Sequence, residues 1–304
     1  MAAEPIGVLL MAYGGPASLD DVEPYLMDVR GGRPTSGELV EEIRRRYAAI
    51  GGRSPILEHT RAQAAALGRA LGPGYAVHVG MRHWHPYIQE AVDQAASRGV
   101  RRMVAIAMAP HYSSLSVGAY QQKVLDAAAG RFELALVRSW GDHPKFLAAV
   151  SEHVTQALQR FPAAARVQVI FTAHSLPERI LKQGDPYADE LRASAAAVAR
   201  DLRLAAWHVA FQSAGASPEP WLGPDAGAVL GRLTGEGFKD FLIVPIGFVC
   251  DHVEILYDID VEYRNLAAKL GVRLERTASL NDDPLLIEAL ADVAAREAAE
   301  RRWA

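Results

Sequence analysis

The sequence predicts an α/β protein made of two similar halves, each with a four-stranded parallel sheet flanked by helices. Eight short apolar runs alternate with longer segments of helical period, which is the pattern of βαβ units. The runs fall four and four around a predicted helix over residues 145–159, which ends before a proline at position 162. We therefore expect one half over residues 1–145 and the other over residues 146–304, with a cleft between them.

Each predicted strand is a short run rich in aliphatic and β-branched residues, bounded by turn-forming or polar residues. In chain order the runs are IGVLLMAY, YAVHVGM, RMVAIAMAP, FELALVRS, VQVIFTAH, AWHVAFQS, FLIVPIGFV and VRLERTAS. The Ala-rich segments AQAAALGRAL and ASAAAVARDL are predicted helices that cover the sheets. The third run of each half leads through polar residues into a helix, which supports similar halves. The last predicted helix belongs to the second half in the sequence, and we expect that it can pack on the first half.

Composition excludes several classes of function. No apolar run reaches the roughly 18 to 20 residues of a membrane span, and the first residues lack a basic region and cleavage site, so we expect a cytoplasmic protein without an integral membrane segment. A net charge of −4 argues against nucleic acid as a partner. The single cysteine, Cys250, excludes an internal disulfide and a cluster held by four cysteines of the chain. Metal binding would have to use His, carboxylate or Tyr.

Polar residues gather where the predicted strands end. In open parallel sheets, ligands bind outside the carboxyl ends of the strands. The ends read YGGP, RHWHP, HYSS, HSLP, QS and DHVE, and four of these six contain histidine. One such histidine alone would more often be a core or capping residue. Their joint placement favours a binding site.

Three carboxylates follow the seventh predicted strand at a spacing of four residues. Glu254, Asp258 and Glu262 would lie along one helical face, where a solvated acidic face is the ordinary interpretation. No Lys or Arg stands between Asp251 and Glu262 to balance the charge, so we expect a hydrated divalent cation such as Fe²⁺ to do so. His174 ends an apolar strand and could accept a proton or bind a metal, and the sequence does not choose between these roles.

An arginine-rich segment follows the first predicted strand. Arg30, Arg33 and Arg53 lie beside glycines in predicted loops, where a guanidinium can bind a carboxylate with both nitrogens. By contrast, the arginines at positions 44–46 fit an exposed helix face paired with the glutamates at positions 41–42. The loop arginines therefore suit an anionic ligand.

Seven stretches in this order carry a family resemblance: LLMAYGGP, RYAAIGGRSPI, GMRHWHP, APHYS, FTAHSLPE, QSAGASPEPWLGPD and PIGFVCDHVEILYDIDVE. Together they resemble the ferrochelatases, lyases that insert Fe²⁺ into a porphyrin, over nearly the whole chain. The resemblance implies a chelatase-like fold of two Rossmann-like halves with a porphyrin cleft between them. It also implies that Fe²⁺ is a substrate, with no permanently bound cofactor and no iron-sulfur cluster.

The resemblance assigns roles to particular residues. His174 and Glu254 match the catalytic pair, and Asp258 and Glu262 continue an acidic line for the metal on an unusually wound helix. Tyr13 matches a tyrosine that faces the metal from the other side of the porphyrin. The expected substrate-binding residues are Tyr13, Arg30, Arg33, Arg53, Ser54, His83 and Tyr112. Whether His174 first takes the pyrrole protons or binds iron is left open.

The resemblance is strongest to the coproporphyrin III branch. QSAGASPEPWLGPD and the arginine loop favour this substrate with four propionates, which would give coprohaem in haem biosynthesis. The alternatives are protoporphyrin IX, a cobalt or nickel chelatase of a sirohydrochlorin-type ring, and a two-lobed binding protein without turnover. We expect a monomer that makes transient contacts with neighbouring haem-pathway enzymes. Cys250, which stands where Ser is frequent, is expected near the site and open to oxidation.

Overall fold

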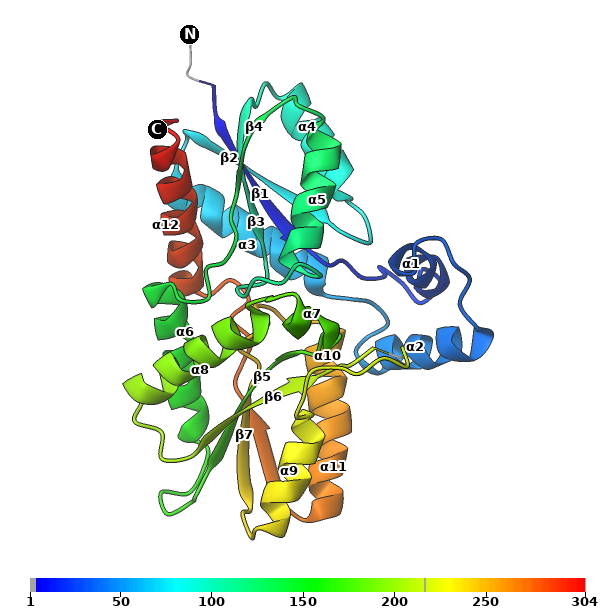
Figure 1. Cartoon of the computed structure of the whole chain (residues 1–304), viewed down its shortest axis with the longest axis vertical. Coiled ribbons are helices and arrows are strands. Elements are labelled where there is room, and N and C mark those ends of the chain that lie inside the picture. Colours follow the sequence, from blue (N-terminus) through cyan, green and yellow to red (C-terminus); the bar gives the residue numbers. More distant parts are fainter. Residues whose placement is uncertain (1–3, 216, 304) are drawn as a thin grey trace.

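The computed structural model describes residues 4–215 and 217–303, and within them the strands form two four-stranded sheets. The first contains β1 (Ile6–Ala12), β2 (Tyr75–Met81), β3 (Arg102–Ala107) and β4 (Glu133–Leu136), in the order β2-β1-β3-β4. The second contains β5 (Gln168–His174), β6 (Trp207–Gln212), β7 (Asp240–Val244) and β8 (Arg273–Arg276), in the order β6-β5-β7-β8. All pairs are parallel. The prediction of two similar α/β halves is confirmed (Figure 1).

Both faces of the first sheet are buried. The helices of this half are α1 (Val22–Val29), α2 (Gly37–Ala49), α3 (Ile56–Leu71), α4 (Ile88–Ser97) and α5 (Val117–Ala128). Successive residues of β1 point to opposite faces, so Leu9 and Met11 pack with α4 and α5 while Val8 and Leu10 join the core that contains Leu67 of α3. Helices α1 and α2 extend to one side of the sheet (Figure 1).

The second sheet repeats this arrangement. Its helices and helical turns are α6 (Pro144–Leu158), α7 (Arg179–Lys182), α8 (Tyr187–Asp201), α9 (Ala226–Gly235), α10 (Val253–Leu256), the π-helix η1 (Asp258–Tyr263), α11 (Arg264–Leu270) and α12 (Pro284–Glu300). Phe171 and Leu242 face the core with α6 and α8, whereas Ile170 and Ile243 face the cluster with α9 and α11. Helix α6 agrees with the helix predicted over residues 145–159, and Pro144 at its first turn fits a helix start.

Helix α12 links the two halves. It contacts α3 and β3 of the first half as well as α6 of the second. Its residues Leu286 and Leu290 belong to the same buried cluster as Leu10 and Phe171, which come from the two different sheets. In Figure 1 it runs along the edge of the molecule beside α3 and above α6.

The carboxyl ends of the two sheets also meet. Cys250, just beyond β7, packs with Ala12 at the end of β1 and Met81 at the end of β2. Gln63 of α3 donates to the backbone carbonyl of Asn281 at 2.7 Å and thereby crosses the same junction. Burial of Cys250 raises the pKa of its thiol to about 12, so its reactive thiolate is disfavoured. The expectation that Cys250 is open to oxidation is therefore wrong.

None of the helices in the described part of the chain is long and apolar enough to cross a bilayer.

Candidate active site

His174 is placed by the edge of the second sheet. It is the last residue of β5 and lies in register with Gln212 of β6, while its carbonyl accepts a hydrogen bond from the Tyr187 hydroxyl at 2.9 Å. Its Nδ1 lies against the carbonyl oxygen of Ser175 and so carries the proton. In the neutral ring the lone pair is then on Nε2, which faces Glu254 Oε1 at 3.6 Å. That nitrogen can accept a proton or bind a metal ion.

Glu254 lies between two histidines. Its other carboxylate oxygen is 3.6 Å from Nε2 of His252, and its backbone carbonyl accepts from the Gln212 side chain at 2.8 Å. Burial alone would raise the pKa of Glu254, but His174 and His252 hold it below its ordinary value. Burial likewise disfavours protonation of His252, yet Glu254 raises the pKa of that ring. Glu254 is therefore ionised at neutral pH, and His252 is biased toward its charged form.

Asp258 and Glu262 lie on the π-helix that follows Glu254. The amide of Glu262 donates to the carbonyl of Tyr257 at 3.0 Å, which is the wide turn of this helix type. Burial raises the pKa of Asp258 to about 6, and nearby Glu254 adds to the rise, against the lowering effects of Arg46 and the Ser213 hydroxyl that donates to Asp258.

No Lys or Arg lies between Asp251 and Glu262 in the sequence, but the fold brings an arginine from another helix to these acids. Arg46 of α2 lies 3.5 Å from Asp258 Oδ1 and 3.5 Å from Glu262 Oε1, and it also pairs with Glu42 at 2.8 Å. Its guanidinium stacks near the Tyr257 ring, 5.2 Å from the centroid. The chain therefore supplies part of the positive charge that the sequence analysis assigned to a bound ion.

Tyr13 and His83 lie at the carboxyl ends of β1 and β2, with their ring centroids 4.7 Å apart. His83 Nδ1 is 2.7 Å from Asp28, but burial dominates and lowers the pKa of the ring to about 4. Desolvation raises the pKa of Tyr13 to about 12; Arg82 opposes this shift and Glu254 adds to it. Both side chains are therefore neutral near pH 7.

The predicted substrate-binding arginines differ in how they are paired. In residues 4–215 and 217–303, Arg30 and Arg33 form no ion pair, and Arg33 donates only to the carbonyl of Arg30 at 3.1 Å. Arg53 is exposed and pairs with Glu58 at 2.8 Å. Arg44 pairs with Glu41 as the helix-face interpretation predicts. Within the described ranges, two of the three loop arginines thus have no carboxylate partner.

Ser54 and Tyr112 have mainly structural contacts. The amide of Ser54 donates to Pro16 at 2.9 Å, and a side chain at Gly15 would place its Cβ 2.5 Å from the Ser54 hydroxyl. Tyr112 lies under the Arg138 guanidinium, 4.4 Å from the ring centroid, and its amide donates to Glu190 at 2.8 Å. These contacts bring neither residue to His174.

No three His, Cys, Asp or Glu side chains of the described ranges converge as a preformed metal cage.

Comparison with known proteins identifies the family of the chain. The family model described as Ferrochelatase matches residues 5–298. The chain belongs to the ferrochelatase family. A ferrochelatase from Herpetosiphon aurantiacus is 46% identical, with 94% of this chain and 97% of that protein covered. A coproporphyrin III ferrochelatase from Geobacillus thermodenitrificans is 39% identical, with 99% and 98% covered.

Solved structures support the chelatase-like fold of the chain. A cobalt complex of the sirohydrochlorin chelatase SirB from Bacillus subtilis subspecies spizizenii matches with a TM-score of 0.61 at 10% identity, over 97% of this chain and 96% of that one. CbiX, described as the terminal enzyme of sirohaem biosynthesis in denitrifying bacteria, matches with a TM-score of 0.55 at 14% identity, over 95% and 98%. At these identities the likeness concerns the fold alone.

The residues expected from the sequence are brought together at the ends of the strands, but several of their partners were not expected. The structure joins His174 with Glu254, the pair that the family resemblance implies. It also joins Asp258 with Ser213, a contact that was not predicted. The structure also brings His252 of the DHVE stretch to Glu254, although the sequence analysis assigned this histidine no role of its own. It also adds Arg46 and Asp28, whose contacts come from α2 and α1 and carry no spacing signal.

Proposed function

We propose that the protein inserts Fe²⁺ into coproporphyrin III, releasing two protons and forming coprohaem in haem biosynthesis. The observation that carries the insertion chemistry is the His174 Nε2 that faces the ionised Glu254 at 3.6 Å in a ferrochelatase-family fold. In this proposal Fe²⁺ is the metal substrate only, no cluster or other cofactor is held, and the enzyme acts as a cytoplasmic monomer.

The proposed catalytic step moves protons away from the porphyrin. The two pyrrole N–H protons leave one after the other as the nitrogen lone pairs turn toward the metal ion. Nε2 of His174 has a free lone pair and accepts each proton in turn. Because 34% of this side chain is exposed, the ring can release the first proton to solvent before it takes the second. The ionised Glu254 stabilises the imidazolium that forms. A rigid site that holds a bent macrocycle would favour this step over binding of the flat substrate.

The metal ion is proposed to approach one face of the macrocycle, while residues of the first half line the opposite face. Asp258 and Glu262 pass the hydrated ion toward Glu254, and both must exchange the Arg46 guanidinium for the ion. Tyr13 and the neutral His83 face the other side of the macrocycle, where Tyr13 offers its phenol oxygen to the metal. Ser54 and Tyr112 are proposed to contact the rim of the porphyrin.

The choice of coproporphyrin III rests on charge. Arg30 and Arg33 lack ion-pair partners in the described part of the chain and can each bind a propionate, while Arg53 would first have to leave Glu58. The relative from Geobacillus thermodenitrificans named for this substrate is 39% identical to the chain. Four propionates would engage such arginines more fully than the two of protoporphyrin IX.

The decisive experiment is anaerobic insertion of Fe²⁺ into coproporphyrin III or protoporphyrin IX, followed by absorption spectroscopy. We expect faster conversion of coproporphyrin III, and His174→Ala should abolish conversion while porphyrin binding is kept. Faster conversion of protoporphyrin IX would refute the substrate and keep the chelatase. Conversion of neither would refute the proposed function, and sirohydrochlorin with Co²⁺ or Ni²⁺ would be tried next.

A further inference from the structure

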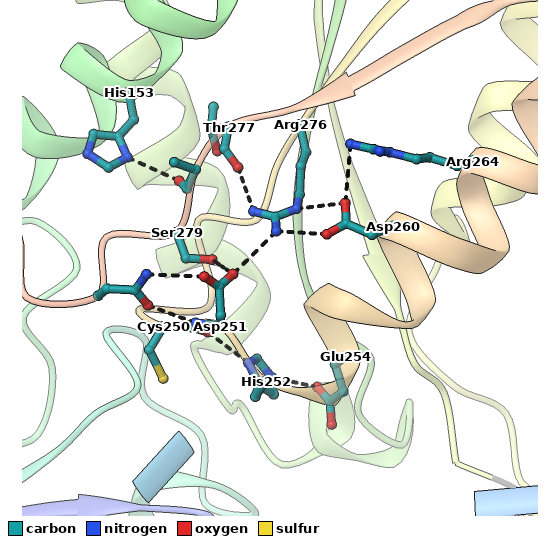
Figure 2. A network of polar contacts seen from close by, with 12 residues as sticks. His153, Cys250, Asp251, His252, Glu254, Asp260, Arg264, Arg276, Thr277 and Ser279 are labelled. Carbon is teal, nitrogen blue, oxygen red and sulfur yellow. Dashed lines mark hydrogen bonds and ion pairs between the residues drawn. The ribbon is translucent and has the colours of Figure 1, made fainter. Parts of the chain in front are cut away.

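A buried polar network lies next to the segment that contains Glu254, and it takes no part in the proposed chemistry. Its centre is Arg276, the last residue of β8, with only 14% of its side chain exposed (Figure 2). The guanidinium binds Asp260 with two nitrogens, Nε to Oδ1 at 2.9 Å and Nη2 to Oδ2 at 2.8 Å. The same Nη2 reaches Asp251 Oδ1 at 3.3 Å, and Nη1 donates to the carbonyl of Thr277 at 3.0 Å.

Both carboxylate oxygens of Asp251 accept hydrogen bonds in this network. Its Oδ1 accepts from the Ser279 hydroxyl at 2.7 Å, and its Oδ2 accepts from the Asn281 amide at 3.1 Å. Asn281 in turn accepts the Asp251 amide at 2.9 Å. Burial would raise the pKa of Asp251, but Ser279, Asn281 and Arg276 together lower it, so the carboxylate is charged at neutral pH.

The two carboxylates that Arg276 binds bracket the candidate active site in the chain. Asp251 directly precedes His252 and comes before Glu254, while Asp260 follows Asp258 on the π-helix. Arg276 therefore closes residues 251–260 into a loop whose two ends are fixed to β8. Figure 2 shows the Arg276 guanidinium between Asp251 and Asp260, with Glu254 on the far side of His252.

We propose that Arg276 is a positioning residue that holds Glu254 and Asp258 in the alignment needed for metal insertion, without contacting either of them. This proposal rests on the proposed function. π-Helices are rare, and most are single turns within α-helices, frequently at functional sites. Outside contacts such as those of Arg276 add to the backbone hydrogen bonds that hold this one. The planar fork of arginine suits this task because it fixes both the distance and the plane of a carboxylate, which lysine cannot do.

The test compares Arg276→Met and Arg276→Lys with a matched control, Arg264→Met. Arg264 also approaches Asp260, at 3.6 Å, but its side chain is 53% exposed and does not touch Asp251. Three measurements are made on the full chain. Mass spectrometry follows amide hydrogen exchange of residues 251–263, fluorescence quenching gives porphyrin affinity, and steady-state kinetics give kcat and KM for Zn²⁺ insertion.

For Arg276→Met we expect exchange of this segment to rise roughly tenfold while the sheets stay protected. The value of kcat should fall roughly 10- to 100-fold, because a shift of about 1 Å at a reacting group has that effect. Porphyrin affinity should be unchanged, Arg276→Lys should restore part of kcat, and Arg264→Met should resemble the wild type in all three measurements.

Two results would overturn the proposal. Faster exchange with an unchanged kcat would make Arg276 a structural residue only, and a lower kcat with equal loss of porphyrin affinity would place it in substrate binding. If Arg276→Met does not fold, Asp260→Asn takes its place, since it breaks the same two-nitrogen contact with little change in shape. A wild-type protein that inserts no metal would refute the proposed function, whereas the exchange data would still decide whether Arg276 holds the segment.

Discussion

Replacing Asp258 with asparagine should stabilise the folded protein at neutral and alkaline pH. The Asp258 side chain is only 9% exposed, and burial raises the pKa of its carboxyl from 3.8 to about 6. A carboxyl that holds its proton more tightly in the folded state lowers the free energy of unfolding as the pH rises from the unfolded pKa to the folded one. The carboxylate therefore destabilises the native protein above about pH 6.

The size of the effect follows from the pKa values. A rise from 3.8 to about 6 corresponds to about 3 kcal/mol of lost stability at pH 8. At about pH 4.5 roughly a third of this loss is present, and none remains well below pH 3.8. Asparagine has the same shape and can still accept from Ser213, but it does not ionise. It should therefore recover most of the loss at pH 8 and little at low pH.

Urea unfolding of the wild type and Asp258→Asn at pH 8 and pH 4.5 measures this difference. The control is Glu262→Gln on the same helix, whose carboxylate is 44% exposed and should affect the unfolding free energy much less. A variant less stable than the wild type at pH 8 would refute the reasoning. So would a gain of equal size at both pH values, since it could not come from ionisation.

Three further predictions concern the reaction. Glu254→Gln should lower kcat for Zn²⁺ insertion about 10²-fold with porphyrin binding unchanged, because the imidazolium loses its counter-charge; a change confined to the KM for metal would assign Glu254 to delivery. Arg46→Met should lower the KM for Zn²⁺, because the ion no longer competes with a guanidinium 3.5 Å from Asp258, and an unchanged KM would contradict this. Arg30→Glu should weaken the binding of coproporphyrin III, measured by fluorescence, more than Arg53→Glu does, because Arg53 is already paired with Glu58. The tetraester of coproporphyrin III has no propionate charges, so an equal weakening of its binding would refute a contact between Arg30 and a propionate.

The sequence predicted the fold because its signals are local. Alternating residues such as Leu9 and Leu10 point to opposite faces of a strand, and both are buried because helices cover each face. The pairing of His174 with Glu254 came from the family resemblance, and the shared edge at the ends of parallel strands is the physical reason that the two can meet.

Other contacts of the site were beyond sequence reasoning because they depend on packing between distant segments. Arg46 seemed satisfied by Glu42 on its own helix, and only the approach of α2 to the π-helix brings it to Asp258 and Glu262. Arg276 similarly gave no signal, since a strand-end arginine reveals nothing of the two carboxylates it binds. The burial of Cys250 depends on side chains from the other sheet, so its low reactivity could not be foreseen either.

Helix α12 has a consequence for how the chain folds as it is made. It packs on α3 and β3, which leave the ribosome long before it, and the carbonyl of Trp303 just beyond it accepts from Arg102 at 3.0 Å. Until α12 emerges, the apolar face of the first half that includes Leu67 lacks its final cover. After the first half has been made, it therefore lacks this cover for about as long as its own synthesis took, and this surface is the one a chaperone would be expected to shield.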